Sequence, residues 1–211
     1  MNNSPTNLIR HLRSLVPRRR LSYQEATRIA ELQANVLREQ LRIADAELPE
    51  TAITNLPRIL VRRRRDLPVS GLTHWHNGRW LIVLNADEPE ARQRFSLAHE
   101  LKHVIDHTTK ERTCWDESWR SGADKAERLA DHFAACLLMP KRHVKATWGT
   151  HPTVQHLAET FGVSIPAARV RASYLGLLDS TPRCLTPRAS WNHLGSTYYR
   201  LASLNLEQAP A

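Results

Sequence analysis

Two histidines and a glutamate lie close together in the segment H-E-L-K-H at residues 99–103. The pattern is H-E-x-x-H, which zinc hydrolases use when it is helical. In a helix, His99 and His103 lie one turn apart on the same face, so both imidazoles can bind one ion. Glu100 lies beside them and can act on a water molecule without being a ligand itself. The pattern therefore predicts a metal-dependent hydrolase with Glu100 as its general base.

The residues around this pattern predict the helix that it requires. Apolar residues recur at intervals of three and four positions, with no Gly or Pro before Gly122. The histidines would then face an apolar environment, which favours the neutral imidazole that ligates metal. Because H-E-x-x-H also occurs by chance, the metal interpretation depends on a further ligand. The apolar positions are Phe95, Leu97, Ala98, Leu101, Val104 and Ile105.

A catalytic zinc ion usually has three protein ligands and an open position for water. We predict that Glu127 is the third ligand, because it begins the next helical pattern, 24 residues after His103. Asp131 follows one turn later and could accept the second ring N–H of a ligand histidine, which fixes its tautomer. The alternative is a solvated helix face on which these acids pair with Lys125 and Arg128.

His107 continues the histidine face, but it lies two turns from His99, too far along a straight helix to share one ion. We interpret it as a residue behind the ligands or at the helix end. The other histidines that we considered are more typical of surface or packing positions: His74, His76, His143, His151 and His156.

The composition allows a sizeable core and indicates a cytoplasmic protein. The chain has 211 residues, with neither an apolar N-terminal leader nor a run of eighteen apolar residues. Its three cysteines, Cys114, Cys136 and Cys184, have no metal-like spacing, and we interpret them as free thiols without chemistry.

The net charge of +9 is concentrated near the N-terminus, where residues 1–65 hold thirteen arginines and six acids. Clustered arginines can neutralise phosphates, so contact with nucleic acid through this region is one interpretation. A solvated surface is the favoured one. No membrane partner is expected.

Helical patterns dominate both ends of the chain. A short amphipathic turn is predicted at residues 8–15, and a long helix from Ser22, which can form a capping box with Glu25, to about Ala46. Further helices are predicted at residues 125–139 before Pro140, at 153–161 and at 164–174. The segment 108–122 has no clear period and is predicted to be a loop.

Between these helices the pattern changes to that of strands. A short strand is predicted at residues 59–61, followed by strands at 72–76 and 79–84 around Asn77-Gly78. Asn-Gly supplies the positive φ angles of a type I′ hairpin. The resulting sheet of about three strands would precede the H-E-x-x-H helix, which should start near Pro89.

Three segments together resemble the ImmA/IrrE family of metallo-endopeptidases, over roughly residues 69–178. They are R-Q-R-F-S-L-A-H-E-L-K-H-V-I-D-H, A-E-R-L-A-D-H-F-A-A-C-L-L-M-P and L-A-E-T-F-G-V-S-I-P-A-A-R-V-R-A-S-Y-L-G-L. One position departs from the family pattern, because Asp131 stands where Asn is commoner.

The resemblance implies a gluzincin-like α+β peptidase, with a small three-stranded twisted sheet packed on a mainly helical bundle. It implies Zn²⁺ on His99, His103 and Glu127, with Glu100 as the general base. It also implies that the substrate is a regulatory protein, usually a helix-turn-helix repressor of a mobile element or stress response. Such a partner is expected to be encoded by a neighbouring gene.

A peptide substrate also needs a strand to pair with and a donor for the developing oxyanion. In gluzincins an edge strand binds the substrate, and residues 71–76 are our candidate, with contacts from Leu72, Thr73 and His74. A simple outer strand is the equal alternative. Arg171, Tyr174 or His151 could supply the oxyanion donor, and the sequence does not choose among them.

We predict four regions: an Arg-rich helical region at 1–65, the zinc peptidase core at 66–150, a helix-turn-helix-like pair at 151–178 and an irregular tail at 179–211. The pair could place Arg169 and Arg171 near DNA, although packing on the core is favoured. The alternative to a peptidase is a zinc-bearing module that binds a protein or DNA without cutting it.

Overall fold

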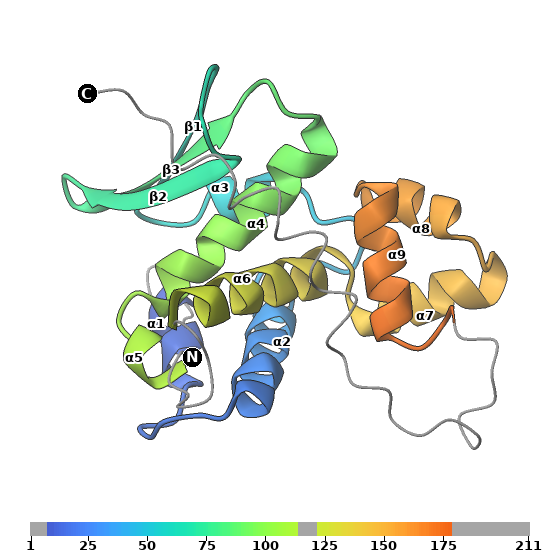
Figure 1. Cartoon of the computed structure of the whole chain (residues 1–211), viewed down its shortest axis with the longest axis horizontal. Coiled ribbons are helices and arrows are strands. Elements are labelled where there is room, and N and C mark those ends of the chain that lie inside the picture. Colours follow the sequence, from blue (N-terminus) through green and yellow to red (C-terminus); the bar gives the residue numbers. More distant parts are fainter. Residues whose placement is uncertain (1–7, 114–121, 179–211) are drawn as a thin grey trace.

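A computed structural model of the chain describes residues 8–113 and 122–178, which form an α+β fold (Figure 1). The predicted fold class is thereby confirmed. A three-stranded sheet lies on one side of the long helix α4, and helices α6 and α2 lie on the other (Figure 1). The predicted tail at 179–211 lies outside the described residues. No helix in the described ranges is long and apolar enough to cross a membrane.

The N-terminal part forms helices α1 (Leu8–Ser14), α2 (Tyr23–Gln40) and α3 (Thr51–Thr54). The predicted capping box is present, because the backbone N–H of Glu25 donates to Ser22 Oγ and the Glu25 carboxylate accepts from the Ser22 N–H. Helix α2 ends before the predicted position near Ala46.

The early end of α2 has a local cause. Arg42 adopts the left-handed conformation, with φ of 55°, and the Ile43 N–H donates to the Arg38 carbonyl at 2.9 Å. A residue with positive φ cannot continue a right-handed helix, so the chain turns there.

The sheet contains β1 (Ile59–Arg64), β2 (Gly71–His76) and β3 (Arg79–Asn85), in the order β1-β3-β2. The predicted hairpin is confirmed, because Asn77 and Gly78 have φ of 47° and 76°. β2 pairs antiparallel with β3, whereas β1 pairs parallel with it. β2 is therefore an edge strand.

Helix α4 (Glu90–Asp106) begins after Pro89, as predicted. It packs against β2 and β3 on one face and against α6 (Gly122–Leu138) on another. Arg13 donates to the carbonyls of Val104 and Ile105, which fastens α1 to the last turn of α4. The short helix α5 (Lys110–Thr113) lies in the segment predicted to be a loop.

The C-terminal helices are α7 (Lys141–Thr150), α8 (Val154–Phe161) and α9 (Ile165–Tyr174). The predicted pair α8 and α9 is confirmed, with Thr153 and Ser164 as N-caps and Gly162 left-handed between them. Helix α7 follows Pro140 directly and was not predicted.

Candidate metal centre

Two helices bring the predicted ligands together. His99 and His103 lie one turn apart on α4, and their Nε2 atoms are 3.0 Å apart. Glu127, near the start of α6, has Oε2 at 3.1 Å from His99 Nε2 and Oε1 at 3.3 Å from His103 Nε2. These two nitrogens and one carboxylate therefore converge on one point.

The spacing of these atoms fits a zinc ion. Zinc binds histidine nitrogen at about 2.0–2.1 Å in tetrahedral sites, which places neighbouring ligand atoms about 3.3 Å apart. The observed separations of 3.0 to 3.3 Å are close to that value. The donor set of two histidines and a glutamate leaves one position for water or substrate, as catalytic zinc sites require.

The electrostatic environment of His99 also favours positive charge. Burial lowers the pKa of His99, but hydrogen bonds with Asp131 and Glu127 outweigh it and raise the pKa to about 10. For Glu127, burial raises the pKa, and hydrogen bonds with His103 and His99 outweigh it and hold the pKa well below its usual value. Surroundings that stabilise an imidazolium would also stabilise a bound cation.

Asp131 lies one turn after Glu127 on α6, with Oδ1 at 2.8 Å from His99 Nδ1. A carboxylate in this position accepts the Nδ1 proton, so in the neutral ring the lone pair of His99 is on Nε2, the atom that faces Glu127. An asparagine in this position would also offer an oxygen acceptor to the Nδ1 proton.

Glu100 is buried between α4 and the edge strand. Its side chain is next to Gly71, where an added Cβ would come within 3.2 Å of Glu100 Cγ and 3.3 Å of Oε1. Burial raises the pKa of Glu100, although His99 and His103 act to lower it. The strand β2 therefore begins directly beside the predicted base.

The strand β2 presents an open edge at this point. The turn pairs His76 with Arg79, and the Asn85 N–H donates to the Ser70 carbonyl, so the even-numbered residues of β2 hydrogen-bond to β3. The backbone groups of Gly71, Thr73 and Trp75 consequently point to the free edge.

The three predicted substrate contacts lie along this edge strand. Leu72 and His74 are exposed. Thr73 is partly buried, and its hydroxyl donates to the Leu81 carbonyl at 3.3 Å. The three side chains are thus on the strand next to Glu100, and the structure alone leaves their role in binding a prediction.

Two of the predicted oxyanion donors have contacts elsewhere. Arg171 is 2% exposed, and its Nε donates to the Met139 carbonyl at 3.0 Å. The Tyr174 ring lies 5.1 Å from the His132 ring, on α6. Among their described contacts, neither side chain touches Glu100 or the two α4 histidines. Both residues are on α9, which packs beside a different part of α6. Helical spacing in the sequence does not show which part of a neighbouring helix α9 contacts.

His107 is the C-cap residue of α4, as its predicted place at the helix end implies. Its ring lies 4.8 Å from the Trp80 ring on β3. Two features were not predicted from the sequence: the close approach of Gly71 to Glu100, and a group formed by Glu31, His132 and Cys136. The spacing H-x-x-x-C in α6 was a signal for the latter.

A helix with H-E-x-x-H, covered by an edge strand and joined by a carboxylate from a second helix, is the framework of zinc peptidases. The chain belongs to the peptidase M78 family, because the model for the IrrE N-terminal-like domain matches residues 58–173. The resemblance to the ImmA/IrrE family is thus confirmed, and the family is one of metallopeptidases.

Among solved structures, a Mycobacterium tuberculosis transcriptional regulator has a similar fold, with a TM-score of 0.57 and 16% sequence identity. The match covers 79% of this chain and 51% of that chain, so our chain spans about half the length of the regulator. At this identity the likeness concerns the fold alone. The comparison with curated proteins gave no match.

Proposed function

We propose that the chain is a zinc-dependent endopeptidase that cleaves a regulatory protein, in particular a helix-turn-helix transcriptional repressor of a mobile element or stress response. The observation that carries the proposal is the convergence of His99, His103 and Glu127 beside the buried Glu100, under an open strand edge. Membership in a metallopeptidase family supports the same reaction class.

In this proposal the two histidines and Glu127 hold Zn²⁺, and Asp131 orients His99 through the 2.8 Å hydrogen bond. A bound zinc ion supplies Lewis-acid chemistry, because it polarises a peptide carbonyl and lowers the pKa of water. Asp131 keeps the ring fixed during turnover, so the ligand atoms remain convergent.

Glu100 takes a proton from the attacking water on its carboxylate and later delivers that proton to the leaving amine. The pKa of Glu100, raised by burial, suits this exchange, because a carboxylate with a pKa nearer to neutral accepts and releases protons more readily. The surrounding strand and helix exclude bulk water from one side of the group.

β2 would bind the substrate by adding a further strand at its free edge. The backbone groups of Gly71 and Thr73 would pair with the substrate backbone, and the exposed side chains of Leu72 and His74 would contact substrate residues. Because Gly71 lies against Glu100, a peptide bound along this edge passes the general base.

The substrate class rests on the family resemblance, which implies regulatory proteins. A repressor encoded by a neighbouring gene is the first candidate, and a DNA-binding substrate would place the activity in the cytoplasm.

The test uses the full chain and candidate repressors encoded near its gene. Glu100→Gln should lower cleavage by about 10²- to 10⁴-fold while zinc content stays unchanged. Glu90→Gln, at the exposed start of the same helix, is the matched control and should cleave normally. Equal cleavage by wild type and Glu100→Gln would contradict the proposed role of Glu100.

The second candidate is a zinc-bearing module that binds a protein or DNA without cutting it. The exposed arginines of β1 and its end, Arg62 to Arg65, favour this candidate, because they form a positive edge on the sheet. Retained zinc with no cleavage, together with DNA affinity that falls steeply with salt, would support it over the peptidase.

A further inference from the structure

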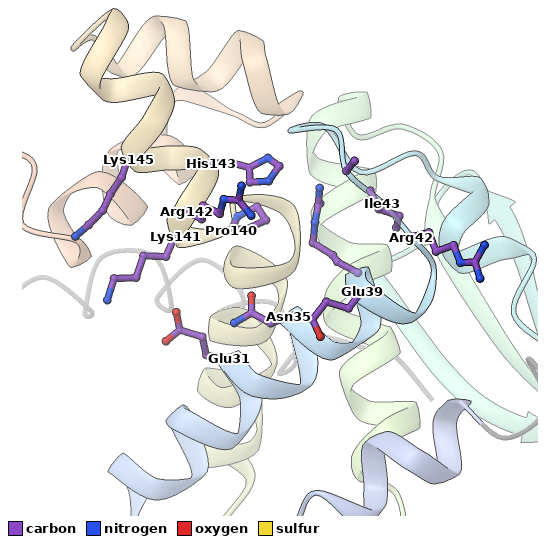
Figure 2. A pocket seen from close by; sticks show the side chains of 12 residues that line it. Glu31, Asn35, Glu39, Arg42, Ile43, Pro140, Lys141, Arg142, His143 and Lys145 are labelled. Carbon is purple, nitrogen blue, oxygen red and sulfur yellow. The ribbon is translucent and has the colours of Figure 1, made fainter. Parts of the chain in front are cut away.

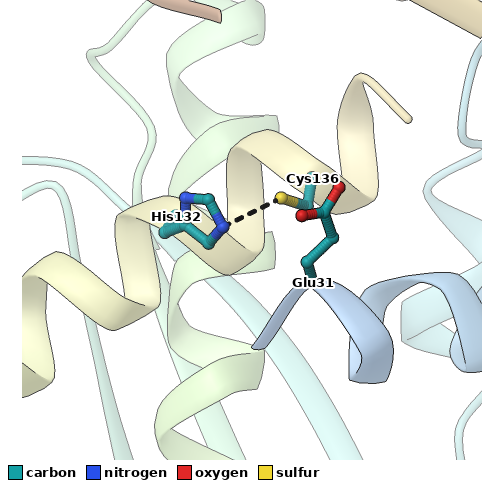
Figure 3. A group of neighbouring side chains, drawn as sticks. All are labelled: Glu31, His132 and Cys136. Atoms are coloured by element: carbon teal, nitrogen blue, oxygen red, sulfur yellow. Dashed lines mark hydrogen bonds between the residues drawn. The ribbon is translucent and has the colours of Figure 1, made fainter. Parts of the chain in front are cut away.

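A second group of metal-binding side chains lies on α6, apart from the His99 group. His132 and Cys136 are one turn apart on this helix, and Glu31 reaches them from α2 (Figure 3). One donor atom from each residue lies within 4.8 Å of the others. His132 Nε2 and Cys136 Sγ are 3.4 Å apart.

The packing of two helices produces this group. α2 and α6 pack together through small residues, because Ala30 and Ala34 on α2 and Ala130 and Ala134 on α6 are fully buried. Small side chains allow close approach of the two backbones. Glu31, the neighbour of Ala30, is thereby brought against the turn of α6 that holds the histidine and the thiol.

The thiol of this group is buried, whereas the carboxylate is partly exposed to solvent. Cys136 is 1% exposed, whereas the side chain of Glu31 is 29% exposed. Glu31 also lines a surface cavity of about 810 Å³ between the second half of α2 and the start of α7 (Figure 2). The carboxylate of Glu31 therefore faces solvent on one side of the group.

Burial favours the neutral form of both the His132 imidazole and the Cys136 thiol. Burial and, to a smaller extent, Arg171 lower the pKa of His132 to about 4, so its imidazole is neutral at pH 7. Neutral imidazole is the ligating form. Burial raises the pKa of the Cys136 thiol to about 11, although Arg171 opposes this effect.

Arg171 supplies an independent observation at the same place. Its Nη2 is buried and has no hydrogen-bond partner among the described residues, and it lies 3.9 Å from Glu31 Oε1. A buried N–H without an acceptor is costly. A thiolate on Cys136 would be an acceptor, and a thiol that coordinates a metal ion loses its proton.

We propose that Glu31, His132 and Cys136 form a second metal site for a divalent d-block cation with affinity for sulfur, such as Zn²⁺. The ion binds Cys136 Sγ, His132 Nε2 and a Glu31 carboxylate oxygen, and the thiol proton is released to solvent. Two anionic ligands offset the charge of the ion, and the guanidinium of Arg171 donates to one of them. Occupancy ties α2 to α6, the helix that carries Glu127.

Cobalt spectroscopy separates this site from the His99 group, which contains no sulfur. The full chain is stripped with a chelator and titrated with Co²⁺ under a non-thiol reductant. The wild type should bind about two ions and show a thiolate-to-cobalt charge-transfer band. Cys136→Ser should abolish the band and bind about one ion. Absence of the band in the wild type at saturating Co²⁺ would overturn the proposal.

Three further variants distinguish cobalt binding at Cys136 from folding defects and from cobalt binding at the His99 group. The double variant Cys114→Ser/Cys184→Ser should keep the band, and its loss there would overturn the assignment. His99→Ala should also keep the band, whether or not the chain is a peptidase. Glu31→Gln, at a partly exposed position, should weaken cobalt binding at the band by at least about tenfold, and unchanged binding would exclude Glu31 as a ligand.

Discussion

The two groups of ligands on α6 share a helix but differ in chemistry and exposure. The His99 group offers two nitrogens and a carboxylate, with Glu127 54% exposed, beside the buried Glu100, the proposed general base, and an open strand edge. The Cys136 group offers sulfur, nitrogen and oxygen around a thiol that is 1% exposed. Catalytic zinc sites keep an open position, whereas sites with cysteine ligands are more often closed and structural.

The two groups differ because side chains at different positions of α6 point in different directions around the helix axis. Glu127 and Asp131 project from α6 toward α4, whereas His132 and Cys136, which follow Asp131 by one and five positions, project toward α2. Successive residues rotate by about 100°, so one helix can supply two faces to two neighbours. Of these two faces, the one toward α4 meets Glu100 and the edge strand, and we therefore place the proposed substrate chemistry there.

The largest expected effect follows from removal of a histidine ligand. His103→Ala removes a ligand, so zinc binding should weaken by more than about 100-fold, which is the upper cost of losing a residue that only hydrogen-bonds to a ligand. Cleavage should disappear with the zinc. His107→Ala, one turn later on the same helix, removes only the contact with Trp80 and should leave zinc in place. Zinc content after dialysis measures both variants. Equal zinc loss in the two variants would contradict the distinction between them.

The partner of His99 should have a smaller effect. Asp131→Ala removes the acceptor for Nδ1 and should weaken zinc binding by about 10- to 100-fold, whereas Asp131→Asn keeps an oxygen and should cost less. A competitive chelator titration gives the affinities. If the two variants bind zinc equally well, the hydrogen bond has no role in holding the ligand.

The contact between the strand and the base can be tested with one methyl group. Gly71→Ala places a Cβ at 3.2 Å from Glu100 Cγ, so the carboxylate must shift by a few tenths of an ångström. Because misplacement of reacting groups slows catalysis steeply, turnover should fall by about tenfold with zinc retained. Gly149→Ala, where a Cβ meets nothing within 4 Å, is the control. Unchanged turnover in Gly71→Ala would show that the contact between β2 and Glu100 has no effect on catalysis.

The smallest effect should come from the free edge of β2. Thr73→Pro removes one backbone N–H that points away from β3, so the sheet should persist. One lost hydrogen bond to substrate should lower kcat/KM by about two- to tenfold. Thr73→Ala keeps that N–H and is the reference variant. Identical kcat/KM in both would indicate that β2 is only an outer strand.

Local patterns predicted most of the elements around the His99 group. Asn77-Gly78 predicted the hairpin through its positive φ angles, and H-E-x-x-H with its apolar spacing predicted α4. Ser22 and Ser164 predicted the starts of α2 and α9. These features depend on a few neighbouring residues, so a single sequence contains the information.

The remaining features were not predictable in this way, because they depend on an uncommon local conformation or on distant residues. The end of α2 is set by the left-handed Arg42, a conformation uncommon for arginine. Glu31 meets His132 and Cys136 across about a hundred residues of sequence, and Arg171 lies with them rather than beside Glu100. Helical spacing identifies which residues share a face, but only tertiary packing decides which helix that face meets.

Anomalous diffraction at the zinc edge, from crystals of the full chain grown with Zn²⁺, tests the central claim most directly. The His99 group should give a peak within bonding distance of His99 Nε2, His103 Nε2 and a Glu127 oxygen, about 2 Å from each. A map without a peak at this position, or with an ion that Glu127 does not touch, would contradict the proposed catalytic site.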